Sequence, residues 1–172
     1  MLLIIKNNVI DLVTNPVLLC AAFAWLLAQL LKVFTSPQYR NGMSLLRFVV
    51  GSGGMPSSHA AAVCATCFSC GILYGYDSAF FAISGVLAAV VMRDAAGIRR
   101  EAGKQAEVIN RISDELNKTN KKMTFEDTLK VLLGHTPLQV VAGAFLGVLM
   151  AFFCQYVLFP VMLPASSPVM LL

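Results

Sequence analysis

The sequence predicts an all-α integral membrane protein: a helical bundle of about four spanning helices with one amphipathic helical loop. Of the 172 residues, 58% are hydrophobic and 13% are charged, and the mean hydropathy is +0.74. A soluble domain of this size needs a more polar surface. The charges are also segregated, because nine of the thirteen Lys and Arg residues lie between Arg93 and Lys130. We therefore expect a single membrane domain over residues 1–172.

Four apolar stretches are candidates for helices that cross about 30 Å of hydrocarbon. They cover residues 16–34, 56–76, 79–92 and 137–159. Gln29 and Lys32 are the polar residues inside the first stretch, and the third is the shortest and needs tilt to span. Glycines four residues apart let a neighbouring helix backbone approach closely. Two copies of the chain could therefore pack through these small-residue helix faces, and a homo-oligomer stays open. The two pairs are Gly71 with Gly75 and Gly143 with Gly147.

The segment over residues 94–133 is polar but keeps a helical pattern. Apolar residues recur at spacings of three and four, which predicts an amphipathic helix from about Ile98 to Leu116. A turn over Asn117 to Met123 follows, and Thr124 then caps a second short helix that carries leucines 129, 132 and 133. We expect this helical pair to lie on the membrane surface or to cover the bundle.

Charge predicts the orientation. Basic residues gather in the loop between the first two stretches and in the long loop before the last, so the positive-inside rule makes both loops cytoplasmic. The N-terminus then faces outward. It lacks the pattern of a cleavable signal peptide and is expected to stay in the mature protein, in a bacterial cytoplasmic (inner) membrane. The isoelectric point near 8.9 fits loops beside anionic lipid, and no nucleic-acid partner is expected, since no basic patch is interleaved with aromatics.

The five cysteines all lie in apolar stretches. Cys64, Cys67 and Cys70 have a spacing that resembles a metal-binding run, but a fourth ligand and a polar second shell are both missing. Packing inside a spanning helix is the favoured interpretation. The sequence predicts no metal site and no cofactor.

Both histidines lie where a loop becomes a spanning helix. His59 begins the second span and His135 begins the fourth, and by the predicted topology both starts are on the cytoplasmic side. Charged residues gather on the same side: Lys32, Arg40, Asp94, Arg99, Arg100 and Lys104. This convergence is the most informative feature of the sequence.

The start of the second span suits an anion. Gly53 and Gly54 allow close backbone approach, and Pro56 is expected to set the first helical turn. The amide groups of Ser57, Ser58 and His59 would then point toward a bound phosphate. With two imidazoles nearby, one can attack phosphorus while the other protonates the leaving oxygen.

A purely structural interpretation stays open for the same residues. Thr136 and Gln139 form the two ends of a capping box, with Pro137 at the first helical position. Ser57 and Ser58 are also common helix caps. The histidines would then be ordinary interfacial groups.

Three strings together resemble the divergent branch of the phosphatidic acid phosphatase type 2 superfamily, which is related to vanadium haloperoxidases. They are GGMPSSHAAAV, RDAAGIRREAGKQAEVIN and LLGHTPLQVVAG, and the likeness runs from AWLLAQLLK through the start of the fourth span. The resemblance implies that His135 is the nucleophile that forms a phosphohistidine and that His59 is the general acid. It also implies that the phosphate is held by Lys32, Arg40, Ser57, Ser58 and Arg99 or Arg100, without a metal.

The chain departs from the superfamily pattern at two positions of the third motif. Leu129 stands where an Arg is expected, and Gln139 stands where an acidic partner of the nucleophile is expected. A neutral Gln stabilises an imidazolium less well than a carboxylate does. Arg99 or Arg100 is the expected substitute for the missing Arg. Asp94, beside these arginines, is expected to form a structural ion pair rather than to ligate a divalent ion.

Three functions remain open from the sequence. The first is a phosphatase that hydrolyses a lipid phosphate or prenyl (di)phosphate at the cytoplasmic face. The second is a non-catalytic protein that binds or transports an anionic membrane lipid with the same residues. The third is a structural protein whose histidines only cap helices.

Overall fold

The computed structural model describes residues 10–35, 54–119 and 135–162. Within these ranges the elements are α2 (Pro16–Thr35), α5 (Ser58–Tyr74), α6 (Ala79–Ala96), α7 (Ile98–Thr119), α8 (Pro137–Phe153), the π-helical turn η1 (Cys154–Leu158) and α9 (Phe159–Met162). No strand occurs in the described part of the chain. The prediction of an all-α membrane bundle is confirmed.

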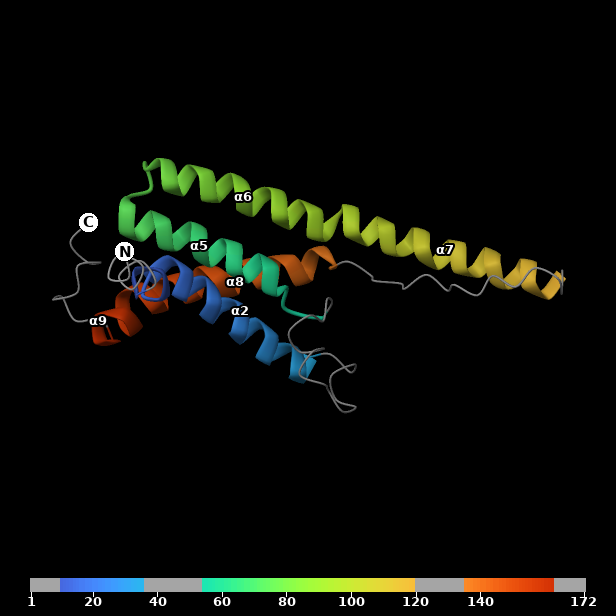
Figure 1. Ribbon diagram of the computed structural model, residues 1–172, viewed down its shortest axis with the longest axis horizontal. Helices are drawn as coiled ribbons and strands as arrows, with labels where there is room; N and C mark the ends of the chain where they lie inside the picture. The colour runs from blue at the N-terminus through green and yellow to red at the C-terminus, as the bar shows by residue number, and fades with distance from the viewer. Residues whose placement is uncertain (1–9, 36–53, 120–134, 163–172) are drawn as a thin grey trace, which may run out of the picture.

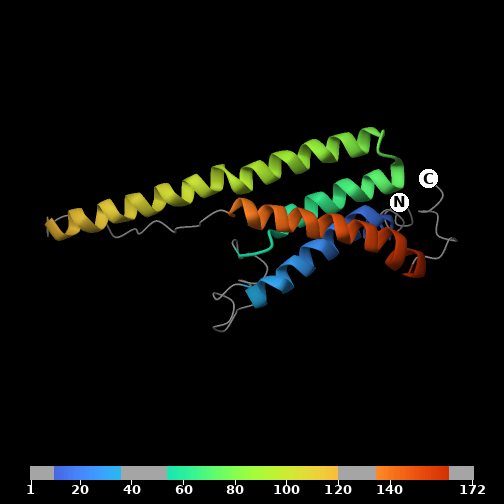
Figure 2. The same ribbon diagram turned by 180° about the vertical axis from the view of Figure 1, so that it is seen from behind.

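Helix α5 is the centre of the bundle and packs against α2, α6 and α8 (Figure 1). Seen from behind, α8 crosses in front of α2 and α5 (Figure 2). Fully buried small residues fill the core: Cys20, Ala24, Ala28, Ala61, Ala65, Ala151 and Cys154. Small side chains let helix backbones approach closely, which is how helices associate in lipid.

The two glycine pairs serve different purposes. A Cβ added at Gly143 or Gly147 would collide with the backbone of α5, so this pair seats α8 directly on α5 within one chain. Gly75 instead ends α5 with φ of 92°, a conformation that favours glycine. Gly71 faces the ring of Tyr76 in the following turn. A homo-oligomer through these faces stays a prediction.

Within the described residues, three stretches are long and apolar enough to cross a membrane: Pro16–Thr35, Ala79–Glu115 and Pro137–Val161. Helix α5, with 17 residues, is shorter. Helix α6 has 18 residues and extends beyond the third predicted stretch, residues 79–92, whose crossing of the bilayer with tilt stays a prediction. The helix runs on to Ala96, since Arg93 in its last turn suits the negative end of the helix dipole. That α5 crosses the whole bilayer stays a prediction.

Helix α7 continues almost in line with α6 and projects beyond the bundle (Figures 1 and 2). It contains the predicted amphipathic helix and ends three residues after Leu116. The sequence left two positions open for this helix, on the membrane surface or over the bundle. In the structure the helix does not cover the bundle. Its apolar face is exposed at Ile98, Ile109 and Ile112. The second helix expected from Thr124, with leucines 129, 132 and 133, lies outside the described residues.

The opposite end of the bundle contains a second buried polar cluster. After α8 the chain forms η1, where Gln155 turns inward and donates a hydrogen bond from Nε2 to the hydroxyl of Ser69 on α5. In the same region, Sγ of Cys20 on α2 lies 3.7 Å from the carbonyl oxygen of Met150 on α8. The sequence predicts a continuous helix here, because a π-helical turn has no simple residue signature.

Candidate functional site

The ends of α2 and α6 and the starts of α5 and α8 lie at the same end of the bundle (Figure 1). Hydrogen bonds join them in pairs. Lys32 donates from Nζ to Oγ of Ser58 at 3.0 Å, and the amide of Ser57 donates to the carbonyl oxygen of Gln139 at 2.9 Å. The amide of His135 donates to the carbonyl oxygen of Ala95 at 3.1 Å. We refer to Lys32, Ser57, Ser58, His135 and Gln139 as the cradle.

Lys32 is the most unusual residue of the cradle. Its side chain is only 1% exposed, although it belongs to the last turn of α2. An ammonium group has three N–H donors, and the neutral hydroxyl of Ser58 is the one partner seen for them within the described residues. No carboxylate of those residues lies within ion-pair distance of it. Because burying a charge without a counter-ion is costly, this position favours a bound anion.

The two serines have different surroundings from those expected. Ser57 is the N-cap of α5, and its hydroxyl accepts a hydrogen bond from the amide of Ala60 at 3.4 Å. Its own amide bonds to Gln139, so the expectation that this amide points toward a ligand is wrong. Pro56 lies before the cap rather than in the first helical turn, because the capping geometry starts the helix at Ser58. Ser58 is the serine beside the buried ammonium.

Gln139 fixes the proton position on His135. Nδ1 of His135 lies 3.2 Å from Oε1 of Gln139, and the amide of Thr136 donates to the same oxygen at 3.0 Å. The backbone donor orients the Gln amide, so Oε1 is the atom that faces the ring. A carbonyl oxygen only accepts, so a neutral ring that bonds to it carries its proton on Nδ1. The predicted capping box is confirmed.

The two histidines differ in burial. His135 is 6% exposed, whereas His59 is exposed in the first turn of α5. Both belong to helix starts at the same end of the bundle, as the sequence predicts. The exposed imidazole can exchange a proton with water, whereas the buried one is shielded from it.

Other predicted site residues are only partly described. Asp94 is half-buried in the last turn of α6. Arg99 and Arg100 lie in the first turn of α7, but their side chains are outside the described part. Arg40 and Leu129 also lie outside the described residues.

Among the described residues, no cluster of three or more His, Cys, Asp or Glu side chains could hold a metal ion. The cysteines of α5 pack against α6. Sγ of Cys64 lies 3.8 Å from Sδ of Met92, and Sγ of Cys67 lies 4.0 Å from the carbonyl oxygen of Phe81. These contacts fit the packing interpretation.

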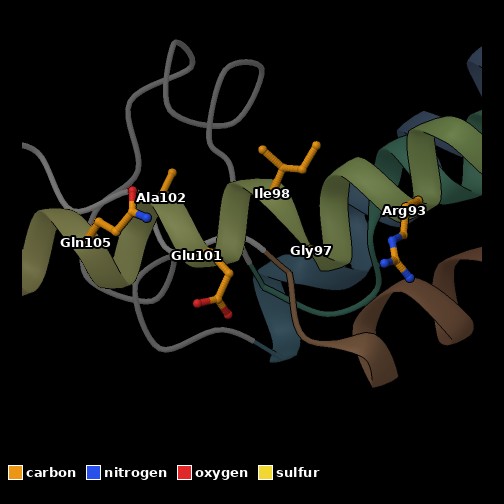
Figure 3. Close-up of a pocket in the computed structure, with 6 residues that line it drawn as sticks. All are labelled: Arg93, Gly97, Ile98, Glu101, Ala102 and Gln105. Carbon is orange, nitrogen blue, oxygen red and sulfur yellow. The ribbon is translucent and has the colours of Figure 1, made fainter.

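Sequence reasoning did not single out Arg93. It lines a groove of about 470 Å³ where α6 meets α7 (Figure 3). The lining residues are Arg93, Gly97, Ile98, Glu101, Ala102 and Gln105. In Figure 3 the guanidinium group of Arg93 points toward the first turn of α8. The adjacent DAAGIRR run drew attention to Arg99 and Arg100, and only the structure shows that Arg93 belongs to the helix turn whose Ala95 bonds to His135.

These features define a helical integral membrane protein with a buried cationic site at one end of its bundle. The chain belongs to the Divergent PAP2 family, whose model matches residues 13–150. It is similar to the uncharacterized membrane protein YuiD of Bacillus subtilis (strain 168), with 38% identity over 156 residues. That alignment covers 85% of this chain and 98% of the relative. No solved structure matches the chain.

Proposed function

We propose that the protein is a phosphatase that hydrolyses a lipid phosphate or prenyl (di)phosphate through a phosphohistidine on His135. The site would lie at the cytoplasmic face of a bacterial inner membrane, with the N-terminus outside. The observation that carries the proposal is the buried ammonium group of Lys32, which bonds to Ser58 in the cradle and has no carboxylate partner among the described residues. A phosphate supplies the missing charge and acceptor atoms.

In the first step, Nε2 of His135 attacks phosphorus and the bond from phosphorus to the leaving oxygen breaks. His59 gives its proton to that oxygen, which leaves as an alcohol or as a prenyl monophosphate. In the second step, His59 takes a proton from water, and the resulting hydroxide displaces His135 from phosphorus. Inorganic phosphate leaves, and both imidazoles return to their starting states.

The remaining residues of the site bind and orient the phosphate. Lys32 and the hydroxyl of Ser58 contact its oxygens and neutralise the charge that develops in the transition state. Ser57 and Gln139 position the site, since they join the start of α5 to the start of α8. Arg40, Arg99 and Arg100 are proposed as further phosphate contacts, and Asp94 as their ion-pair partner.

A second candidate function rests on Gln139. A phosphohistidine ring is cationic, and a neutral amide oxygen at 3.2 Å stabilises it less than a carboxylate does. The same cradle would then bind or transport an anionic lipid without turnover. The two functions share the Lys32 contact and differ in whether His135 reacts.

The test is release of phosphate from a panel of lipid phosphates and prenyl diphosphates by purified protein in detergent. Wild type is compared with His135→Asn, which keeps a side-chain donor toward Gln139, and each assay is run with and without EDTA. We expect wild-type release that survives EDTA and vanishes in the variant. Binding of these lipids by wild type without any release would favour the second function, and release that needs a divalent ion would contradict the mechanism.

A further inference from the structure

We infer that Arg93 is a further phosphate-binding residue of this site and supplies a guanidinium group from α6. The inference rests on the proposed function and adds to it a residue that lies outside the motifs of the first and last spans. The observation behind it is the direction of the Arg93 side chain, which points from the end of α6 toward the first turn of α8 (Figure 3).

The position of Arg93 is fixed relative to the cradle by a backbone contact. Ala95, two residues further along α6, accepts the hydrogen bond from the amide of His135 at 3.1 Å. Ala95 also packs with Ala60 and Val140 in a small buried cluster, so the last turn of α6 is held against the starts of α5 and α8. The helix that carries Arg93 therefore has a defined place beside the proposed nucleophile.

The charge of Arg93 is available for a ligand. Within the described residues, no carboxylate lies within ion-pair distance of its guanidinium group. Other basic residues on the same helical rod differ: Lys104 pairs with Glu101 at 2.7 Å, and Arg111 pairs with Glu107 at 3.5 Å. Guanidinium binds phosphate through two parallel N–H bonds, which a lysine does not reproduce.

The geometry also gives Arg93 a role distinct from that of Lys32. Lys32 is buried and approaches from α2, whereas Arg93 is exposed and approaches from α6 at one end of the groove. A phosphate that contacts both groups would be held from two sides. An exposed guanidinium also remains able to meet the phosphate as it arrives from the membrane surface.

The experiment measures binding of orthovanadate and of a short-chain lipid phosphate to purified protein in detergent, with phosphate release measured in parallel. The variants are Arg93→Gln and Arg93→Lys, and the matched control is Arg111→Gln, which removes an exposed arginine of α7. Loss of one charged, bidentate contact is expected to weaken vanadate binding about tenfold in Arg93→Gln. Arg93→Lys is expected to recover only part of the vanadate binding. Arg111→Gln is expected to bind vanadate as tightly as wild type.

Each other outcome overturns a specific claim. Unchanged vanadate binding in Arg93→Gln, with wild-type binding and turnover intact, would remove Arg93 from the site and leave the proposed function standing. If wild type binds vanadate but does not release phosphate, the phosphatase proposal fails. Vanadate binding by the Arg93 variants still tests whether Arg93 contacts the anion. If wild type does not bind vanadate at all, both fail.

The surrounding membrane is the alternative source of phosphate for Arg93. Wild type and Arg93→Gln are therefore also compared in vesicles with increasing phosphatidylglycerol. If the substitution changes only the dependence on phosphatidylglycerol and leaves vanadate binding unchanged, the guanidinium contacts bulk headgroups and the inference is wrong.

Discussion

The bundle buries polar side chains at both ends of α2, α5 and α8, and the two clusters differ in charge. At one end, neutral groups are joined by hydrogen bonds: Gln155 donates to Ser69, and Cys20 donates to the carbonyl oxygen of Met150. At the other end, the cradle contains an ammonium group whose one described partner is a serine hydroxyl. Both clusters are shielded, so burial alone does not distinguish them.

The difference supports the proposal that the cradle binds an anion. Neutral groups that bond to one another stabilise helix contacts in an apolar setting. A buried charge without a charged partner, as Lys32 is among the described residues, carries a desolvation penalty that an anion would offset. We therefore propose a structural role for the Gln155 cluster and a binding role for the cradle. Substitutions at four positions test this comparison.

The largest effect is expected from His135→Ala. Removal of the nucleophile should lower phosphate release by about a thousandfold or more. Lipid phosphate binding should remain within about threefold of wild type, because Lys32 and Ser58 still hold the phosphate. Turnover and equilibrium binding on the same preparation check this, with thermal unfolding as the control for folding. Turnover retained in the variant would exclude His135 as the nucleophile.

Lys32→Met should separate binding from stability. Methionine has a similar length without the charge, so phosphate binding should weaken about a hundredfold. The melting temperature should stay the same or rise, because an uncompensated buried charge has been removed. Binding measurements and thermal unfolding in detergent give both numbers. A clear loss of stability with normal phosphate binding would mean that Lys32 is a structural residue.

Gln155→Leu should give the opposite result. Loss of the hydrogen bond to Ser69 leaves a buried hydroxyl with one partner fewer and should lower the unfolding free energy by about 1 kcal/mol. Phosphate binding should not change, because the cradle lies at the other end of the helices. Thermal unfolding and vanadate binding measure the two effects. Weakened vanadate binding in a folded variant would show that the two clusters are coupled.

The smallest effect is expected from Gln139→Glu. Glutamate keeps the capping box and adds the charge that favours a cationic ring on His135, so turnover should rise a few-fold. Gln139→Leu is the matched comparison, since it removes the acceptor that holds the proton on Nδ1. Initial rates at saturating substrate check both variants. If the two variants had equal rates, the Gln139 contact would have no role in catalysis.

Much of the bundle could be predicted from residue patterns. The apolar stretches, the Thr136 capping box and the α8 glycine pair follow from local chemistry, and each is present in the structure. Long-range contacts could not be predicted in this way. The bond from His135 to Ala95 and the direction of Arg93 depend on how α6 and α8 are placed, which no local pattern encodes.

The boundaries of the elements were predicted least well. The sequence alone does not show that Ser57, rather than Pro56, determines where α5 starts, because both residues favour helix starts. It also does not show that Gln155 turns inward through a π-helical turn. In contrast, the functional importance of Lys32 could be predicted from the sequence, because a charged residue within an apolar helix commonly marks a functional site.

The most direct test of the central claim is a search for the phosphorylated enzyme. Wild type and His59→Ala are mixed briefly with a ³²P-labelled lipid phosphate, denatured in base, and digested for peptide mapping. The mechanism predicts a label on His135 that is stable in base and labile in acid, and that is absent from His135→Asn. Phosphate release without any label on His135, in both wild type and His59→Ala, would contradict the phosphohistidine mechanism.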